Sequence, residues 1–291
     1  GGWEDSGVAG HILGHYLSAL SMQYRATHNP RIKARVDYIV GELALCQEKN
    51  GHGYVSAIPG GKAMFADVAA GRGDGVHRGW VPWYTMHKLL AGLRDAYLYA
   101  DNAQAKDVLV RLSDWTVDTT RNLSDEQWQV MLEQEHGGMN EVLADVYALT
   151  GEPKYLELSR KFYQKSVLDP LTLREDRLTG LHGNTQIPKL IGLARLYELT
   201  DPKDKTAAEY FWDRVVHTRT YAIGANTDGE HFDAPGQLSH HLSPSTAETC
   251  NTYNMLKLTR HLFEWTPSAE YADFYERALY NHILASQDPV R

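Results

Sequence analysis

Glu248 and Cys250 are the two residues whose types and spacing most directly suggest chemistry. A helical pattern starts at this point, and the exposed N–H groups of a first helical turn favour the thiolate form of a cysteine. Thiolate and carboxylate are both ligands that zinc accepts. The second cysteine, Cys46, lies in an amphipathic stretch among apolar residues and is predicted to be a core residue. Structural zinc takes four ligands, so Glu248 and Cys250 supply two zinc-type ligands but do not by their spacing alone establish a zinc site.

Glu230 is the second carboxylate of interest, in the irregular segment that leads to the Cys250 helix. Its neighbours in Asp228-Gly229-Glu230-His231-Phe232 are partly aromatic, and an apolar setting can keep a carboxyl group protonated for use as a general acid. The alternative is a solvated loop carboxylate with no catalytic role.

His11 and His15 are spaced one helical turn apart, as metal ligands on a helix can be. No glutamate follows His11, as the helix of a metalloprotease would require. We therefore predict that both are satisfied core residues or pocket-wall residues.

The elements that position these residues are helices joined in hairpins. An aromatic residue, a short spacer and a helix-breaking residue recur five times, which predicts five helical hairpins in sequence. The five segments are 24–30, 97–103, 147–153, 197–202 and 263–268. The ten expected helices span 6–28, 31–48, 83–100, 104–120, 139–150, 153–166, 185–199, 203–219, 248–265 and 268–286. The fold class is therefore an all-α toroid or solenoid, and a closed (α/α)₆ barrel would require one further hairpin.

Polar, acidic and ring-bearing residues gather at the starts of the first helices of these hairpins. In an up-and-down array these starts share one rim, where rigid scaffolds build sites. The second helices begin with plain caps such as Asn29-Pro30. Asp5, Asn184 and Thr246 could each be only an N-cap, but the five-fold coincidence favours a binding site. Its candidate residues are Trp3, Asp5, Tyr84, His87, His136, His182, Asn184 and Gln186.

Two long connections, 49–82 and 220–247, interrupt the helices and are predicted to be irregular walls of a cleft. A brief alternating pattern near 218–223 is the one hint of a strand.

Composition narrows the class of protein. The chain has 291 residues, 43% of them hydrophobic and 23% charged, as in ordinary globular proteins. Its net charge of −8 argues against nucleic-acid binding, and no apolar run is long enough to span a membrane. The first residues lack the features of a signal peptide. Seven Trp, seventeen Tyr and fourteen His suit a protein that stacks on and hydrogen-bonds to a polar small molecule.

Several ordered motifs give the chain an end-to-end resemblance to glycoside hydrolase families 127 and 146, the β-L-arabinofuranosidases. Those motifs are Gly-Gly-Met-Asn-Glu-Val-Leu-Ala-Asp at 137–145, His-Gly-Asn-Thr-Gln-Ile-Pro at 182–188, Gly-Glu-His-Phe at 229–232, Glu-Thr-Cys-Asn-Thr-Tyr-Asn-Met at 248–255 and Tyr-Glu-Arg-Ala-Leu-Tyr-Asn at 275–281.

The resemblance implies an (α/α)₆ barrel followed by β-sandwich domains, and retaining hydrolysis of a terminal β-L-arabinofuranoside in plant glycans or glycoproteins. By the matching motifs, Glu230 resembles the general acid/base, and Glu248 and Cys250 resemble two ligands of a zinc ion. His87 and His182 match histidines that contact the sugar, and His136 is a looser match.

The family's nucleophile is a zinc-bound cysteine, and it lies with an adjacent cysteine ligand downstream of the Glu-x-Cys motif. This chain ends at Arg291 before that point. The resemblance therefore implies that residues 1–291 are a single barrel domain, truncated at both ends of a longer protein, without the nucleophile. Cys250 is a conceivable substitute nucleophile.

The alternatives are a glycosidase of the same fold with another sugar specificity, or a non-catalytic carbohydrate-binding toroid. Export and oligomeric state stay open.

Overall fold

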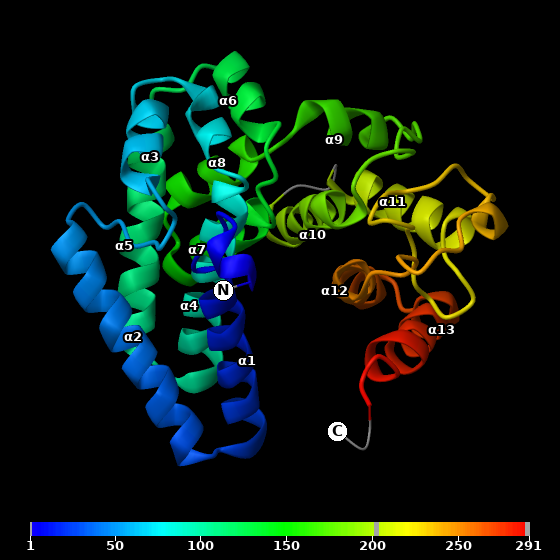
Figure 1. The fold of residues 1–291 in the computed structure, drawn as a ribbon, viewed down its shortest axis with the longest axis horizontal. Coiled ribbons are helices and arrows are strands. Elements are labelled where there is room, and N and C mark those ends of the chain that lie inside the picture. The colour runs from blue at the N-terminus through cyan, green and yellow to red at the C-terminus, as the bar shows by residue number, and fades with distance from the viewer. Residues whose placement is uncertain (1, 201–203, 289–291) are drawn as a thin grey trace. The chain divides into compact units, whose positions relative to one another are not determined.

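The computed structural model describes residues 2–200 and 204–288 and is built from helices (Figure 1). Over these residues β-pairing is limited to isolated bridges, one of which joins Thr220 to Asn226 beside the segment that hinted at a strand. The chain divides into two compact units, Gly1–Tyr163 and Gln164–Arg291. None of the described helices is both long and apolar enough to cross a membrane.

Five successive hairpins form in the described residues, as the repeated helix breakers predict. Each pairs a first helix with the helix that follows it: α1 (His11–Thr27) with α2 (Pro30–Asn50), α4 (Pro82–Ala100) with α5 (Ala103–Thr120), α7 (Met139–Thr150) with α8 (Pro153–Lys161), α10 (Gly183–Leu199) with α11 (Asp204–Thr218), and α12 (Thr249–Trp265) with α13 (Ala269–Ala278). The plain caps predicted for second helices are present. The side chain of Asn29 accepts a hydrogen bond from the N–H of Arg31, and that of Asn102 accepts one from Ala105.

Short helices lie outside the hairpins, and several bounds differ from the sequence prediction, including that of the last helix, which ends at Ala278 instead of 286. The short helices are α3 (Gly61–Ala69), α6 (Asp125–Leu132) and α9 (Lys165–Thr172), with 3-10 turns at η1 (Gly2–Asp5), η2 (Gly73–Arg78) and η3 (Leu238–His240) and a π-helical turn at η4 (Leu279–Leu284). The connection 49–82 is therefore partly helical, the first long helix begins at residue 11 instead of 6, and α8 ends at 161. One or two turns contain too few residues to display a helical period.

The connection 49–82 also contributes to the core of the first unit. Tyr54 and Phe65, from this connection, contact Trp115 of α5 in tilted and edge-on arrangements, at ring-centroid distances of 4.8 and 5.0 Å. Phe65 also contacts Trp83, whose ring lies 5.4 Å from that of Phe162. This segment is therefore a structural part of the unit as well as a connection.

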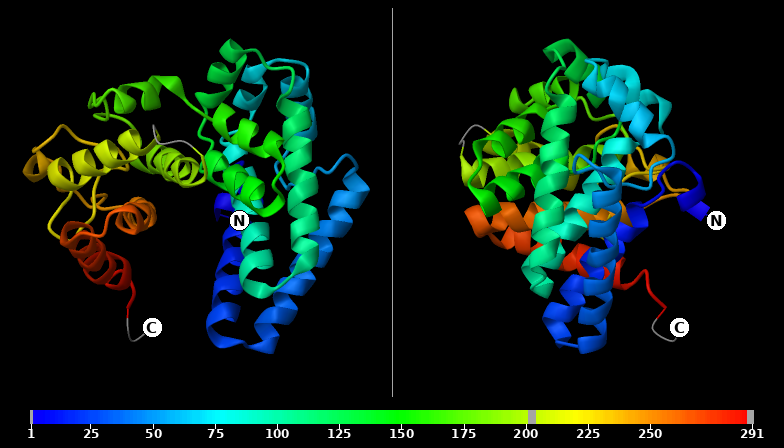
Figure 2. Two further views of the ribbon diagram at one scale, coloured as in Figure 1. Left: turned by 180° about the vertical axis from the view of Figure 1, so that it is seen from behind. Right: turned by 90° about the vertical axis from the view of Figure 1, so that its left-hand side faces the viewer.

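Close helix packing in the first unit depends on two glycines. A Cβ at Gly92 of α4 would lie 2.7 Å from the carbonyl oxygen of Gly14 in α1, so the two backbones touch there. α2 and α5 lie side by side on the outside of this pair in both views (Figures 1 and 2). Cys46 of α2 is exposed, and the prediction that it is a core residue is wrong. The buried stripe of α2 passes through Leu43 and Gln47, which leaves Cys46 beside it and facing outward.

In the second unit, α10 and α12 are the central packed pair. Asn254 of α12 donates a hydrogen bond to the side-chain oxygen of Asn184 in α10 at 2.7 Å. Trp212 of α11 donates one to Thr259 of α12 at 2.8 Å. These hydrogen bonds fix the relative position of α10, α11 and α12. The starts of α10 and α12 carry candidate residues of this unit.

Candidate active site

Glu230 lies at the tip of a tight turn. Asp228 and His231 exchange backbone hydrogen bonds of 3.3 and 3.2 Å, and both central residues have a positive φ, 53° at Gly229 and 68° at Glu230. This is the geometry of a two-residue turn of type I′, in which glycine is favoured. The backbone of Glu230 is in the left-handed region, although the residue is not glycine. This conformation costs free energy and is concentrated at functional sites.

Backbone hydrogen bonds bring this turn to the starts of α10 and α12. The bonds link 226–232 to the segment ahead of α10 on one side and to the segment ahead of α12 on the other. They are Gly183 N–H to Glu230 O (2.8 Å), Phe232 N–H to Leu181 O (2.9 Å), Gly229 N–H to Ser245 O (3.1 Å) and Ala247 N–H to Thr227 O (3.0 Å). Glu230, His182 and the Glu248–Cys250 pair are therefore carried by three segments that are bonded to one another.

The buried side chain of Arg219 anchors the segment that follows the Glu230 turn. Arg219 is 2% exposed and makes two hydrogen bonds to the carboxylate of Asp176, at 2.8 and 2.9 Å, and a third to the carbonyl oxygen of Asp233. Burial acts to raise the pKa of Asp176, but the hydrogen bonds from Arg219 and Arg214 outweigh it and lower that pKa. The forked geometry fixes the loop in a way that a lysine could not reproduce.

His182 joins the start of α10 to Glu230. It is the N-cap residue of α10, where its Nδ1 accepts hydrogen bonds from the N–H of Thr185 at 3.3 Å and from the Thr185 hydroxyl at 3.1 Å. Its Nε2 lies 3.1 Å from Oε2 of Glu230. The side chains of His182 and Glu230 are 32% and 57% exposed, so both can reach a ligand.

Gln186 and Asn184 are both engaged within the protein. Gln186 donates to the backbone carbonyl of His182 at 3.1 Å and accepts a hydrogen bond from the buried Lys189 at 2.7 Å. Asn184 accepts its hydrogen bond from Asn254 and is not the N-cap of α10, a role that His182 fills. Sequence reasoning missed Lys189, although a lysine between Ile187 and Leu190 on an inner helix was a visible signal.

Glu248 and Cys250 lie at the start of α12. Glu248 is the N-cap residue, although its carboxylate makes no capping hydrogen bond, and Cys250 is an exposed residue of the first turn. A carboxylate and an accessible thiol two positions apart at a helix start fit the ligand chemistry of zinc. Thr246 does not cap this helix and instead donates to Asp228 at 3.1 Å.

In the first unit, His87 packs against the glycine pair that follows His136. A Cβ at Gly137 would lie 2.8 Å from Nδ1 of His87, and one at Gly138 would lie 2.8 Å from its Nε2. Both histidines are buried, and Nδ1 of His136 lies 3.2 Å from the carbonyl oxygen of Gln134. The structure therefore places His87 against Gly137 and Gly138, next in sequence to His136, at a close approach that glycine permits.

A buried ionic cluster lies next to these histidines. A Cβ at Gly138 would be 3.1 Å from Oε2 of Glu141, whose other oxygen lies 3.8 Å from Arg94. Burial alone would lower the pKa of Arg94, but Asp95, Asp145 and Glu141 raise it well above its usual value. Arg94 is thus a permanent cation, and sequence reasoning did not identify it.

The remaining candidates of the first unit lie at the start of α1 and α4. The N-cap residue of α1 is Gly10 and not Asp5, and the carboxylate of Glu4 accepts hydrogen bonds from the N–H of Gly10 at 2.6 Å and of Ile12 at 3.2 Å. Asp5 is exposed, and the side chain of Trp3 lies outside the described part of the structure. The ring of Tyr84 is 6.2 Å from that of His11.

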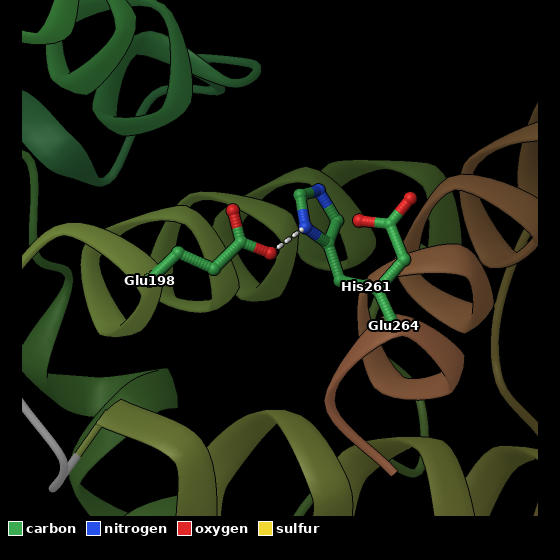
Figure 3. Close-up of side chains that lie close together, drawn as sticks. All are labelled: Glu198, His261 and Glu264. Carbon is green, nitrogen blue, oxygen red and sulfur yellow. Dashed lines mark hydrogen bonds and ion pairs between the residues drawn. The ribbon is translucent and has the colours of Figure 1, made fainter. Parts of the chain in front are cut away.

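One group of three metal-ligand side chains exists among the described residues, and it lies away from Glu230. Glu198 of α10 and His261 and Glu264 of α12 have ligand atoms within 4.8 Å of one another (Figure 3). Glu198 already accepts hydrogen bonds from His261 at 2.6 Å and from Trp265 at 3.0 Å. These hydrogen bonds connect α10 to α12, so the group has a structural role in this structure.

Comparisons with known proteins agree with this architecture. The structure matches that of a GH127 β-L-arabinofuranosidase from Geobacillus stearothermophilus T6 with a TM-score of 0.73 and 19% identity, over 97% of this chain and 47% of the other. A second solved structure, of a GH127 β-arabinofuranosidase, matches with a TM-score of 0.68 and 19% identity, over 91% and 43%. The fold is thus all-α, of the (α/α)₆-barrel class found in glycosidases.

Within that class the chain belongs to the β-L-arabinofuranosidase GH127 catalytic domain family, whose model matches residues 1–291. A curated relative, the non-reducing end β-L-arabinofuranosidase of Bifidobacterium longum subsp. longum, is 24% identical over 223 residues. The aligned region is 63% of this chain and 32% of that relative. The chain thus spans about half or less of the length of these relatives.

Proposed function

We propose that the protein is a retaining, exo-acting glycoside hydrolase that removes terminal β-L-arabinofuranosyl groups from plant-derived glycans or glycoproteins. The observation that carries this proposal is the placement of Glu230, held in a left-handed turn at the starts of α10 and α12 with His182 beside its carboxylate. Membership of the GH127 family and the names of the relatives support the choice of sugar.

Glu230 is the proposed general acid/base. As an acid it donates a proton to the glycosidic oxygen as the bond to the leaving group breaks. As a base it later takes a proton from the water that releases the sugar. An exposed carboxyl group on a rigid turn suits this role, because it must reach both the leaving group and the incoming water.

Glu248 and Cys250 would hold a zinc ion as two of its ligands. The ion would supply a Lewis acid that keeps ligand thiols in the thiolate form near neutral pH. The chain itself presents both ligands from the start of α12. The hydrogen bond from the N–H of Ala247 to the carbonyl oxygen of Thr227 anchors this helix start to the Glu230 turn.

Sugar recognition is proposed for the remaining candidates. His87, His136 and Tyr84 of the first unit, with Asp5 and Trp3, supply rings and hydrogen-bonding groups of the kind that bind sugars. In the second unit His182 would contact the sugar, and Gln186 and Asn184 would hold the helix start from which it projects.

The test is hydrolysis of p-nitrophenyl β-L-arabinofuranoside by the protein in its full natural length, with zinc and a reductant present. We expect turnover, and we expect Glu230→Gln to lower kcat about 100-fold or more, because the water that releases the sugar then lacks its general base. Glu264→Gln, an exposed carboxylate on the far half of α12, is the matched control and should retain activity.

The alternatives give different results. Turnover of another glycoside but not of this one would assign the same chemistry to another sugar. Sugar binding without hydrolysis of any glycoside, in a folded protein loaded with zinc, would contradict the proposal and indicate a carbohydrate-binding protein.

A further inference from the structure

The two ring nitrogens of His182 have different hydrogen-bond partners: Nδ1 faces the backbone N–H of Thr185, and Nε2 faces the carboxylate of Glu230. The N–H of Thr185 can only donate, so Nδ1 of His182, 3.3 Å away, must accept and cannot carry a proton. In neutral imidazole the proton is then on Nε2. Nε2 lies 3.1 Å from Oε2 of Glu230, so the N–H of Nε2 donates to that oxygen.

We infer that His182 is a positioning residue that assigns different tasks to the two oxygens of Glu230, an inference that rests on the proposed function. Capping of α10 locks His182 in its Nε2–H form. Oε2 of Glu230 accepts from this N–H, and Oε1 carries the proton that is transferred to the glycosidic oxygen. The arrangement persists through the reaction, because Oε2 can accept in both the carboxylic acid and the carboxylate.

The neighbouring His231 provides an internal contrast. Its Nδ1 lies 2.6 Å from the carbonyl oxygen of Gly229, which can only accept, so Nδ1 of His231 carries the proton. The rings of His182 and His231 are in edge contact, with centroids 5.3 Å apart. His231 of the Glu230 turn and His182 at the start of α10 are therefore expected to be opposite tautomers.

The first experiment measures these tautomers by long-range nitrogen–proton NMR of the neutral imidazoles in histidine-labelled protein. We expect a protonated Nε2 in His182 and a protonated Nδ1 in His231, with the His182 signals identified by their loss in His182→Asn. Thr185→Val is the matched variant. It removes the hydroxyl but keeps the backbone N–H, so the Nε2–H form should persist. A protonated Nδ1 in His182, or a mixture of tautomers, would overturn the inference.

The second experiment separates orientation of the acid from binding of the sugar. His182→Asn keeps a good N-cap residue, while its shorter side chain cannot reach Glu230 in the same way. A β-L-arabinofuranoside with an alkyl leaving group depends on the proton from Glu230, and the p-nitrophenyl glycoside depends on it much less. We expect kcat/KM to fall about 100-fold for the alkyl glycoside and less than about 10-fold for the p-nitrophenyl one.

Equal losses on both substrates would show that His182 only binds the sugar and would overturn the positioning role. If the wild-type protein hydrolysed neither substrate but showed the expected tautomers, the proposed function would fail while the lock on His182 stood. The NMR and kinetic results therefore distinguish the two failures.

Discussion

At the scale of single residues, Glu230 combines a proposed catalytic role with an unfavourable backbone. Its φ of 68° is one that glycine adopts without strain. We expect Glu230→Gly to abolish hydrolysis and yet raise the free energy of unfolding by up to about 1 kcal/mol. Urea unfolding checks this against Glu230→Gln, which keeps the Cβ and should show no gain. A loss of stability in Glu230→Gly would mean that the turn carries no strain at this residue.

Glu198 is the residue whose protonation should affect stability most clearly. Burial acts to raise its pKa, but the hydrogen bond and charge of His261, with bonds from Arg195 and Trp265, lower it to about 2. Because the folded pKa is below the usual value, this carboxylate stabilises the fold above about pH 4.5, and the stabilisation is lost as the pH falls towards 2.

Glu198→Gln is therefore expected to lower the free energy of unfolding by roughly 1–3 kcal/mol at neutral pH. The difference from wild type should shrink as urea unfolding is repeated down to about pH 3. A difference that is independent of pH would show that Glu198 contributes through packing alone.

At the scale of elements, the contact between the starts of α10 and α12 has no room for a side chain at Gly183. A Cβ there would lie 2.6 Å from Nδ2 of the fully buried Asn251 and 2.8 Å from Cγ2 of Thr227. We expect Gly183→Ala to destabilise the protein by about 1–3 kcal/mol, a usual cost of overpacking. Thermal or urea unfolding measures it.

Gly41 of α2 is the control for that substitution, because a Cβ there meets nothing within 4 Å. Gly41→Ala should stabilise by roughly 0.5–1 kcal/mol through helix propensity alone. If both substitutions had the same sign, the effect of Gly183→Ala would reflect propensity and not the contact with Asn251.

At the scale of the whole molecule, helical hairpins were predictable and the connections were not. Paired helices have a long apolar period and capped ends such as Asn29-Pro30, so the sequence alone locates them. The connection 49–82 has no period, and its packing of Tyr54 and Phe65 into the core depends on residues distant in sequence. Glu230 and His182 were each identifiable as candidates from their local sequence. Their hydrogen bond was not, because it joins residues 48 positions apart.

The division into two compact units leads to a prediction about unfolding. One cluster of buried apolar residues extends from Leu17 to Phe162, entirely within the first unit. Phe162 is fully buried against Trp83 and Trp128, so Phe162→Ala should cost about 3–5 kcal/mol. Because each unit has its own packed helices, we expect this loss to be confined largely to residues 1–163.

Native-state hydrogen exchange measures where protection falls. In Phe162→Ala the amides of α4, α5 and α7 should lose protection, while those of α10 and α12 keep theirs. Phe211→Ala is the reciprocal variant, since Phe211 is fully buried in the second unit with its ring 6.0 Å from that of Phe232. It should lower protection in α10–α12 and spare α4 and α5. Equal losses in both units from either substitution would instead show that the chain unfolds as one cooperative body, with the candidate residues of both units depending on a single folding equilibrium.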